Sequence, residues 1–252
     1  MRQLLSILAI LAVLPLGGQN FSAELKPHSA ILKHGPLNIL IHKKYPLVTI
    51  DGKLPLHLSA QHSDEGQMLE LQQNSPEIKT VRRLSRIGKN RDDENVQTEI
   101  TVTIRNGFPG IFISSKTYNR DFIGAVKCRQ VWSLPATTAS MPADNGELRL
   151  GTAWKKRPAC EYILYTGSNG KTYGIITADL RSPNRTIHSN IGINDFGKTK
   201  GNWFFGVSNG EFEQDQFSEI KFILVPVRNI PELKTIYKML KQKRELESLW
   251  KY

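Results

Sequence analysis

Residues 179–188 bring several chemically reactive side-chain types close together in the sequence. The segment Asp-Leu-Arg-Ser-Pro-Asn-Arg-Thr-Ile-His holds an acid, two arginines and a histidine. Histidine can act as a general acid or base near neutral pH, and arginine binds carboxylate or sulfate oxygens through paired hydrogen bonds. His188 and Asp179 are therefore candidate catalytic residues, and Arg181, Arg185 and His188 are candidate ligand contacts. An ordinary polar loop would explain the same composition.

Three tryptophans lie in or beside β-prone segments, and the run Lys155-Lys156-Arg157 directly follows one of them. An exposed indole offers a flat apolar surface to a sugar ring, while neighbouring polar groups fix its orientation. Core packing is the alternative role for each indole. The residues that we predict to contact a ligand through their rings are Trp132, Trp154 and Trp203.

Other motifs exclude common chemistries. Gly170-Lys171-Thr172 resembles the end of a phosphate-binding loop, but Tyr165 occupies the position where that loop requires glycine. The chain contains no Gly-x-Ser-x-Gly nucleophile motif. Its two cysteines and unpaired histidines form no zinc signature. We therefore expect neither a metal nor a cofactor.

The beginning of the chain predicts export. A positive charge at Arg2 precedes an almost wholly apolar run over residues 4–16. A helix of this length is too short to cross a bilayer core of ~30 Å, and the pattern is typical of a secretory signal peptide. We expect a signal peptide over residues 1–23, with an ill-defined cleavage site, and a periplasmic or extracellular location. An uncleaved N-terminal anchor is the alternative.

Net charge points to a class of partner. The chain carries a formal charge of +11 and no other long apolar stretch, so we expect no integral membrane segment in the mature part. A basic exported protein favours an anionic polysaccharide or cell-envelope polymer, and export argues against nucleic acid. Solubility alone is the alternative explanation for the charge.

The chain has two cysteines, Cys128 and Cys160. An oxidising compartment permits a disulfide between them. In the chain-entropy model such a bond, which closes a loop of roughly thirty residues, contributes about 3 kcal/mol. We predict that they are bonded, and two buried free thiols remain the alternative.

The rest of the chain alternates β-prone runs with turn signals. Asn-Gly and Asp-Gly pairs accept the positive φ that a two-residue hairpin turn requires. Without internal repeats or a linker, the pattern predicts one antiparallel β-sandwich over residues 24–228. The turns are expected at Asp51-Gly52, Asn106-Gly107, Asn169-Gly170 and Asn209-Gly210, and Asn145-Gly146 is a further candidate.

A helix is expected only in residues 229–252. Asn229 can cap it, Glu232 lies three residues later as a capping-box partner, and Pro231 falls in the first turn. An apolar stripe with helical spacing predicts an amphipathic helix packed on the sandwich. A membrane-surface helix is the alternative. The stripe contains Leu233, Ile236, Tyr237 and Leu240.

Residues 108–121 run Phe-Pro-Gly-Ile-Phe-Ile-Ser-Ser-Lys-Thr-Tyr-Asn-Arg-Asp. This stretch resembles a strand-and-turn pattern of galactose-mutarotase-like supersandwich domains, which occur in carbohydrate-active enzymes. The resemblance implies a supersandwich-like fold. Mutarotases proper use paired histidines and a glutamate, and no motif in this chain matches that set. The epimerase activity is therefore not implied.

These observations favour one function over two others. The first hypothesis is a carbohydrate-binding or carbohydrate-processing accessory domain with a preference for anionic glycans. The second is a carbohydrate-active lyase or epimerase that uses His188 and Asp179. The third is a non-enzymatic structural or interaction module of the envelope. A cleft that gathers histidine, carboxylate and arginine would distinguish the enzyme from the other two.

Overall fold

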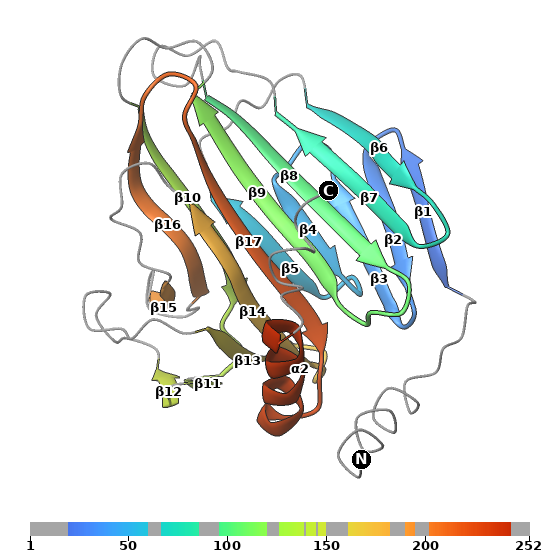
Figure 1. Ribbon diagram of the computed structural model, residues 1–252, viewed down its shortest axis with the longest axis vertical. Coiled ribbons are helices and arrows are strands. Elements are labelled where there is room, and N and C mark those ends of the chain that lie inside the picture. The colour runs from blue at the N-terminus through green and yellow to red at the C-terminus, as the bar shows by residue number, and fades with distance from the viewer. Residues whose placement is uncertain are drawn as a thin grey trace.

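The computed structural model describes residues 20–59, 67–85, 96–119, 126–138, 140–144, 146–149, 161–181, 190–194 and 202–242. Within these residues two antiparallel β-sheets share one core, and a C-terminal helix covers part of the outer face of one sheet (Figure 1). This architecture confirms the predicted all-β sandwich with a single C-terminal helix.

The two sheets differ in how many of their neighbouring strands are consecutive in the chain. The eight-stranded sheet begins as a meander of consecutive strands and ends with three later ones. In spatial order it contains β1 (Phe21–Lys26), β2 (Ser29–His34), β3 (Leu37–His42), β4 (Leu47–Ile50), β5 (Leu54–Ser59), β10 (Val126–Pro135), β16 (Asn202–Phe212) and β15 (Asn190–Asn194). The nine-stranded sheet contains β12 (Gly146–Arg149), β11 (Ser140–Ala143), β13 (Tyr162–Thr166), β14 (Thr172–Arg181), β17 (Phe217–Pro226), β9 (Ile111–Asn119), β8 (Val96–Arg105), β7 (Ile78–Leu84) and β6 (Met68–Asn74).

Residues at positive φ turn the chain between paired strands. Asp51 and Gly52, at φ of 52° and 67°, lead β4 back into β5. Positive φ at both turn residues gives a twist that matches the flanking strands. Gly107 and Gly170, at φ of 80° and 73°, lie in the β8–β9 and β13–β14 connections. The hairpins expected at these three pairs are present.

The expected turn at Asn209-Gly210 is wrong, because this pair lies inside β16. Cys128 pairs with Gly210 and Gln130 pairs with Val207, so the register between β10 and β16 shifts at this point. An extra residue in one strand of a pair is a β-bulge, which asparagine and glycine accommodate as readily as they do a turn. The turn itself follows over residues 213–216.

The main core lies between the sheets. Along β3, Leu37, Ile39 and Ile41 are buried, and along β8, Val102 and Ile104 are fully buried. Strand side chains alternate between faces, so each strand directs every second residue into this core. Fully burying one such aliphatic side chain contributes about 1.5–3 kcal/mol. The burial of these alternate residues therefore holds the two sheets together.

Helix α2 (Ile230–Gln242) begins at the cap that the sequence predicts. The Glu232 amide donates to Asn229 Oδ1 at 3.0 Å. Leu233 approaches β14 so closely that a Cβ added at Gly174 would lie 2.2 Å from its Cδ1. The helix therefore packs directly on the outer face of the nine-stranded sheet (Figure 1), where it buries Leu233, Tyr237 and Leu240.

The predicted leader over residues 1–23 lies mostly outside the described residues. Strand β1 begins at Phe21, so it overlaps the last residues of that leader and starts before the predicted sandwich boundary at residue 24. Cleavage and export stay predictions. Within the described residues, no helix is both long and apolar enough to cross a membrane.

Candidate functional site

The outer face of the nine-stranded sheet changes character along its strands. Ile223 of β17 and Phe112 of β9 are buried in the cluster beneath α2. Four residues away on the same two strands, the outward positions carry charge, at Lys116 and Glu219. Residues separated by an even number share one face of a strand. The same face is therefore apolar under the helix and charged beyond it.

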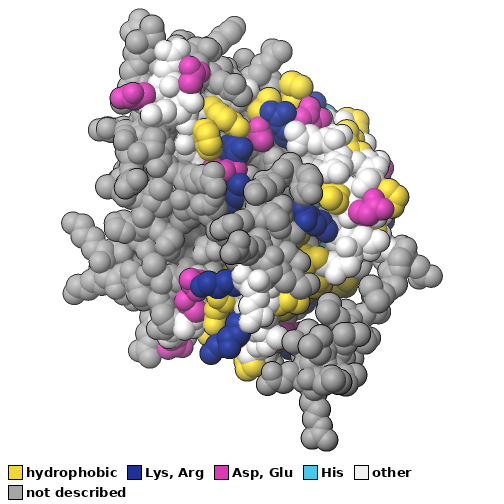
Figure 2. Space-filling view, in the orientation of Figure 1, with side chains coloured by type: hydrophobic (Ala, Val, Ile, Leu, Met, Phe, Trp, Pro, Cys, Tyr) yellow, Lys and Arg dark blue, Asp and Glu magenta, His cyan; other side chains and the backbone are white. Residues whose placement is uncertain are grey.

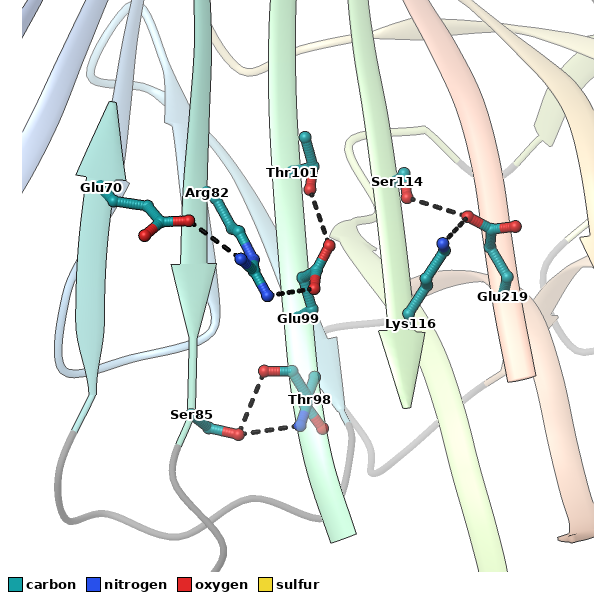
Figure 3. A network of polar contacts seen from close by, with 9 residues as sticks. All are labelled: Glu70, Arg82, Ser85, Thr98, Glu99, Thr101, Ser114, Lys116 and Glu219. Carbon is teal, nitrogen blue, oxygen red and sulfur yellow. Dashed lines mark hydrogen bonds and ion pairs between the residues drawn. The ribbon is translucent and has the colours of Figure 1, made fainter. Parts of the chain in front are cut away.

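Six charged residues on this face form two ion-pair groups, which the pairing of Glu99 with Lys116 across β8 and β9 brings side by side, and we call the six together the outer band. Figure 3 shows the band without Lys221, from Glu70 and Arg82 through Glu99 to Lys116 and Glu219, and Figure 2 shows acidic, basic and hydrophobic side chains interspersed over the same face of the molecule. Three members are acidic and three are basic, so their formal charges cancel. The outer band consists of Glu70, Arg82, Glu99, Lys116, Glu219 and Lys221.

Arg82 of β7 forms ion pairs with both carboxylates of the first ion-pair group, which lies on β6, β7 and β8. Its guanidinium lies 3.0 Å from Glu70 Oε1 and 3.0 Å from Glu99 Oε2. Burial disfavours the charged guanidinium, but the two carboxylates outweigh burial and raise the pKa of Arg82 above its ordinary value. The charge of Arg82 is therefore compensated by two carboxylates, although its Nε is buried without a hydrogen-bond partner.

Glu219 of β17 occupies the centre of the other half of the outer band. Lys116 Nζ lies 3.4 Å from its Oε1, and Lys221 Nζ lies 3.2 Å from its Oε2. The Ser114 hydroxyl donates to Oε1 at 3.5 Å. Only 3% of Glu219 is exposed, so its carboxylate depends on these cations and not on water. Lys116 is the more exposed of the two lysines, with 30% of its side chain accessible.

An aromatic pair borders this carboxylate. The rings of Tyr118 and Phe217 lie 5.8 Å apart at an angle of 45°. Lys116 Nζ lies 5.3 Å from the centre of the Phe217 ring, and 36% of Phe217 is exposed. Lys116 thus contacts both the ring and the carboxylate of Glu219.

This arrangement combines two kinds of contact at one place. An aromatic face can pack against the apolar C–H surface of a sugar ring. The neighbouring Lys116 ammonium, whose side chain is 30% exposed, can donate hydrogen bonds to its hydroxyl groups. Because Phe217 is partly exposed and the Lys116 ammonium is fixed by its ion pair with the buried Glu219, both features are in position before a ligand arrives.

Trp132, which the sequence analysis assigned to the ligand site, lies in the core. It is fully buried on β10, and its indole N–H donates to Ser115 Oγ at 3.0 Å. Its ring meets Phe222 edge to face with the centroids 5.4 Å apart. It faces inward because it alternates with the outward residues of its strand. Trp132 therefore offers no stacking surface to a ligand, and this assignment is corrected.

The remaining predicted site residues are only partly located. Trp154, Arg185 and His188 lie outside the described residues. For Trp203, Asp179 and Arg181 the structure describes the backbone. Trp203 lies on β16 opposite Leu134, in the eight-stranded sheet. These residues stay predictions as site residues.

Two of them lie in register with the outer band. On β14, Arg181 pairs with Glu219 and Asp179 pairs with Lys221 of β17. The backbone thus brings the start of the reactive segment at residues 179–188 beside the outer band, whereas Trp203 belongs to the other sheet. The sequence analysis grouped Trp203 and Arg181 in one site, and the structure assigns them to different sheets.

The sequence analysis missed Lys116, Phe217 and Glu219. The signal was available in part, since Phe217, Glu219 and Lys221 recur with the period of two that a strand requires. Nothing in that period shows which face is outward. Lys116 and Glu219 are also distant in the sequence, and only the pairing of β9 with β17 brings them together.

Neither the metal nor the disulfide prediction is decided by these residues. In the described ranges, no three histidine, cysteine or acidic side chains gather in an arrangement that could hold a metal ion. Cys128 lies on β10 opposite Gly210, and Cys160 lies outside the described residues. The Cys128–Cys160 bond stays a prediction.

Comparison with known proteins gives structural neighbours only. No protein-family model matches the chain, and no curated protein matches it. The α-N-acetylgalactosaminidase NagBb from Bifidobacterium bifidum, in complex with GalNAc, matches with a TM-score of 0.48 and 10% identity, over 89% of this chain and 39% of that one. A heparan sulfate lyase HepC mutant from Pedobacter heparinus matches with a TM-score of 0.46 and 8% identity, over 83% of this chain and 37% of that one.

The galactosidase domain of the α-galactosidase–sucrose kinase AgaSK matches with a TM-score of 0.37 and 10% identity, over 75% of this chain and 29% of that one. These neighbours are carbohydrate-active enzymes. The chain spans well under half the length of each. Similarity at this level carries no argument about the function of this chain.

Proposed function

We propose that the chain is an exported carbohydrate-binding or carbohydrate-processing accessory domain with a preference for anionic glycans. The observation that supports this function best is the partly exposed Phe217–Tyr118 pair beside the Lys116–Glu219 ion pair. Aromatic rings next to fixed polar groups suit a sugar, which has both apolar ring faces and hydroxyl groups. The galactose-mutarotase-like resemblance of residues 108–121, which include β9, is part of this proposal.

The anionic preference rests on the whole chain and not on the outer band. Within the outer band three acids offset three bases, so this surface has no net attraction for an anion. The formal charge of the chain is +11, and such a charge raises the local concentration of polyanions through its long-range field. We therefore propose that ring stacking selects the sugar and that net charge favours acidic chains.

A glycan array tests the proposal. The folded protein is expected to bind uronate-containing or sulfated glycans, and the signal should weaken as salt rises, because charges are screened beyond ~8 Å at physiological ionic strength. Phe217→Ala should weaken binding about three- to tenfold through loss of stacking, while the salt dependence persists.

Tyr45→Ala is the matched control. Tyr45 is 51% exposed, and Lys44 Nζ lies 5.4 Å from its ring centre, so it reproduces the lysine–ring contact of Phe217 at another place. If binding falls with salt but is unchanged in both Phe217→Ala and Tyr45→Ala, the glycan is held by nonspecific charge attraction. If folded protein binds no glycan on the array, the glycan hypothesis is excluded. The remaining hypothesis is then the structural or interaction module of the envelope.

The enzyme alternative needs its own readout. Turnover of a bound glycan that disappears in His188→Ala and Asp179→Ala, with binding retained, would favour the lyase or epimerase over a binding module. Arg181→Ala, Arg185→Ala, Trp154→Ala and Trp203→Ala test the other predicted contacts in the same array.

A further inference from the structure

The inner face of the nine-stranded sheet also changes character along its strands. On β9 the inward residues pass from Ile111 and Ile113 to hydroxyl and amide side chains, and β7 and β8 make the same change toward the same end of the sandwich. All of the polar residues concerned are fully buried. They are Arg83, Ser85, Thr98, Ser115, Thr117 and Asn119.

The serine hydroxyl groups of this layer have partners within it or across the core. The Ser85 hydroxyl donates to the Thr98 carbonyl at 3.1 Å and accepts from the Thr98 amide at 2.9 Å. Ser115 accepts the indole N–H of Trp132 at 3.0 Å. These neutral groups are satisfied, as buried polar groups usually are.

Arg83 differs from them in two respects. Its Nε and Nη2 donate to the carbonyls of Lys43 and Lys44 in the β3–β4 connection, at 3.0 and 3.2 Å. Its Nη1 is buried and has no hydrogen-bond partner. In the part of the chain that the structure describes, no carboxylate forms an ion pair with Arg83, and burial lowers its pKa to about 10. Two carbonyl dipoles do not cancel a full positive charge, so among the described residues the site lacks one negative charge and one acceptor.

We propose that Arg83 binds a small monovalent inorganic anion, such as chloride, between the two sheets. One negative charge neutralises the guanidinium, and an acceptor at Nη1 completes its hydrogen bonds. A single-atom anion requires the least space beside a side chain that is fully buried. Water would satisfy Nη1 but would leave the charge uncompensated. The site lies on the inner face, opposite the outer band, and is independent of glycan binding.

Thermal unfolding of the full chain in chloride tests the site. At constant ionic strength, with gluconate replacing chloride, the midpoint should rise by about 3 to 5 °C for each tenfold increase in chloride above its Kd. Arg83→Met should abolish this dependence. Arg82→Met is the control, because it removes the neighbouring guanidinium on the opposite face and should leave the chloride dependence unchanged.

A second measurement needs no variant and covers the case in which Arg83→Met fails to fold. Crystals of the wild-type protein soaked in bromide should give an anomalous peak within hydrogen-bonding distance of Arg83 Nη1. Peaks only at surface lysines, a water at Nη1, or a chloride dependence that persists in Arg83→Met would overturn the proposal.

Discussion

Arg82 and Arg83 are consecutive residues of β7, and their guanidinium groups have opposite surroundings. Arg82 faces outward between Glu70 and Glu99, each 3.0 Å away, and its pKa is raised. Arg83 faces inward and, within the described ranges, bonds two carbonyls and no carboxylate, and burial lowers its pKa to about 10. One step along a strand reverses the face, and with it the electrostatic environment.

The comparison extends to the two faces of the nine-stranded sheet. On the outer face, charges pair with one another and an aromatic pair remains partly exposed. On the inner face, aromatic and hydroxyl groups are sealed in the core, and the charge of Arg83 among them has no carboxylate partner in the residues that the structure describes. The proposed glycan contact therefore lies on the outer face, whereas the buried residues of the inner face contribute to stability.

The largest expected effect is the difference in stability loss between removing a buried aromatic ring, Trp132, and removing a partly exposed one, Phe217. Trp132→Ala should destabilise the protein by about 3–5 kcal/mol, because it leaves a cavity at a fully buried position. Phe217→Ala should cost about 1 kcal/mol or less, since Phe217 is 36% exposed. Denaturant unfolding followed by circular dichroism measures both. Equal losses would show that the two faces do not differ in this way.

A smaller effect distinguishes buried from solvated charge within the outer band. Glu219→Gln should cost about 3 kcal/mol, because it leaves two lysines without their carboxylate at a site that is 3% exposed. Glu70→Gln should change stability by about 1 kcal/mol or less, since 42% of the Glu70 side chain is accessible. Urea titrations of the two variants provide the comparison. A loss in Glu70→Gln as large as that in Glu219→Gln would refute it.

His34 extends the comparison to the inner face of the other sheet. Burial lowers its pKa below the usual 6.5, and its hydrogen bond to the Phe108 carbonyl offsets only part of this effect. The unfolded chain therefore binds a proton before the folded protein does, and stability should fall as pH drops below about 6.5. His34→Leu should flatten this part of the stability curve.

His28→Leu is the control for that experiment, at an exposed histidine in the β1–β2 connection. Stability measured between pH 7 and 5 should differ from the wild-type curve in His34→Leu alone. An unchanged slope in His34→Leu would assign the acid sensitivity to other groups.

Local features of the fold were predictable from the sequence, because their causes are local. The cap at Asn229 and the turn at Asp51-Gly52 each depend on a few neighbouring residues, and both are present. Asn209-Gly210 has the same local signature but forms a bulge in β16, because its pairing with β10 decides between the two. A local signal therefore identifies an irregularity without fixing its kind.

The candidate site was not predictable in the same way. Lys116 and Glu219 meet only through the pairing of β9 with β17, and neither strand specifies its partner. Trp132 shows the complementary difficulty, since a tryptophan in a β-strand suits either the core or a sugar, and the strand's inward register decides for the core. The sequence supplied the residue types, and long-range pairing determined which of them meet.

Mapping a bound glycan onto the two faces tests the central claim most directly. Backbone amide shifts of the isotope-labelled chain would be followed during titration with a heparin hexasaccharide, as a sulfated, uronate-containing probe. The account predicts that the largest changes occur on the outer face around Lys116–Tyr118 and Phe217–Glu219, and that Phe217→Ala reduces them. Changes centred on the eight-stranded sheet, around Lys33 of β2 or Tyr45 in the β3–β4 connection, or an absence of changes at saturating probe, would contradict it.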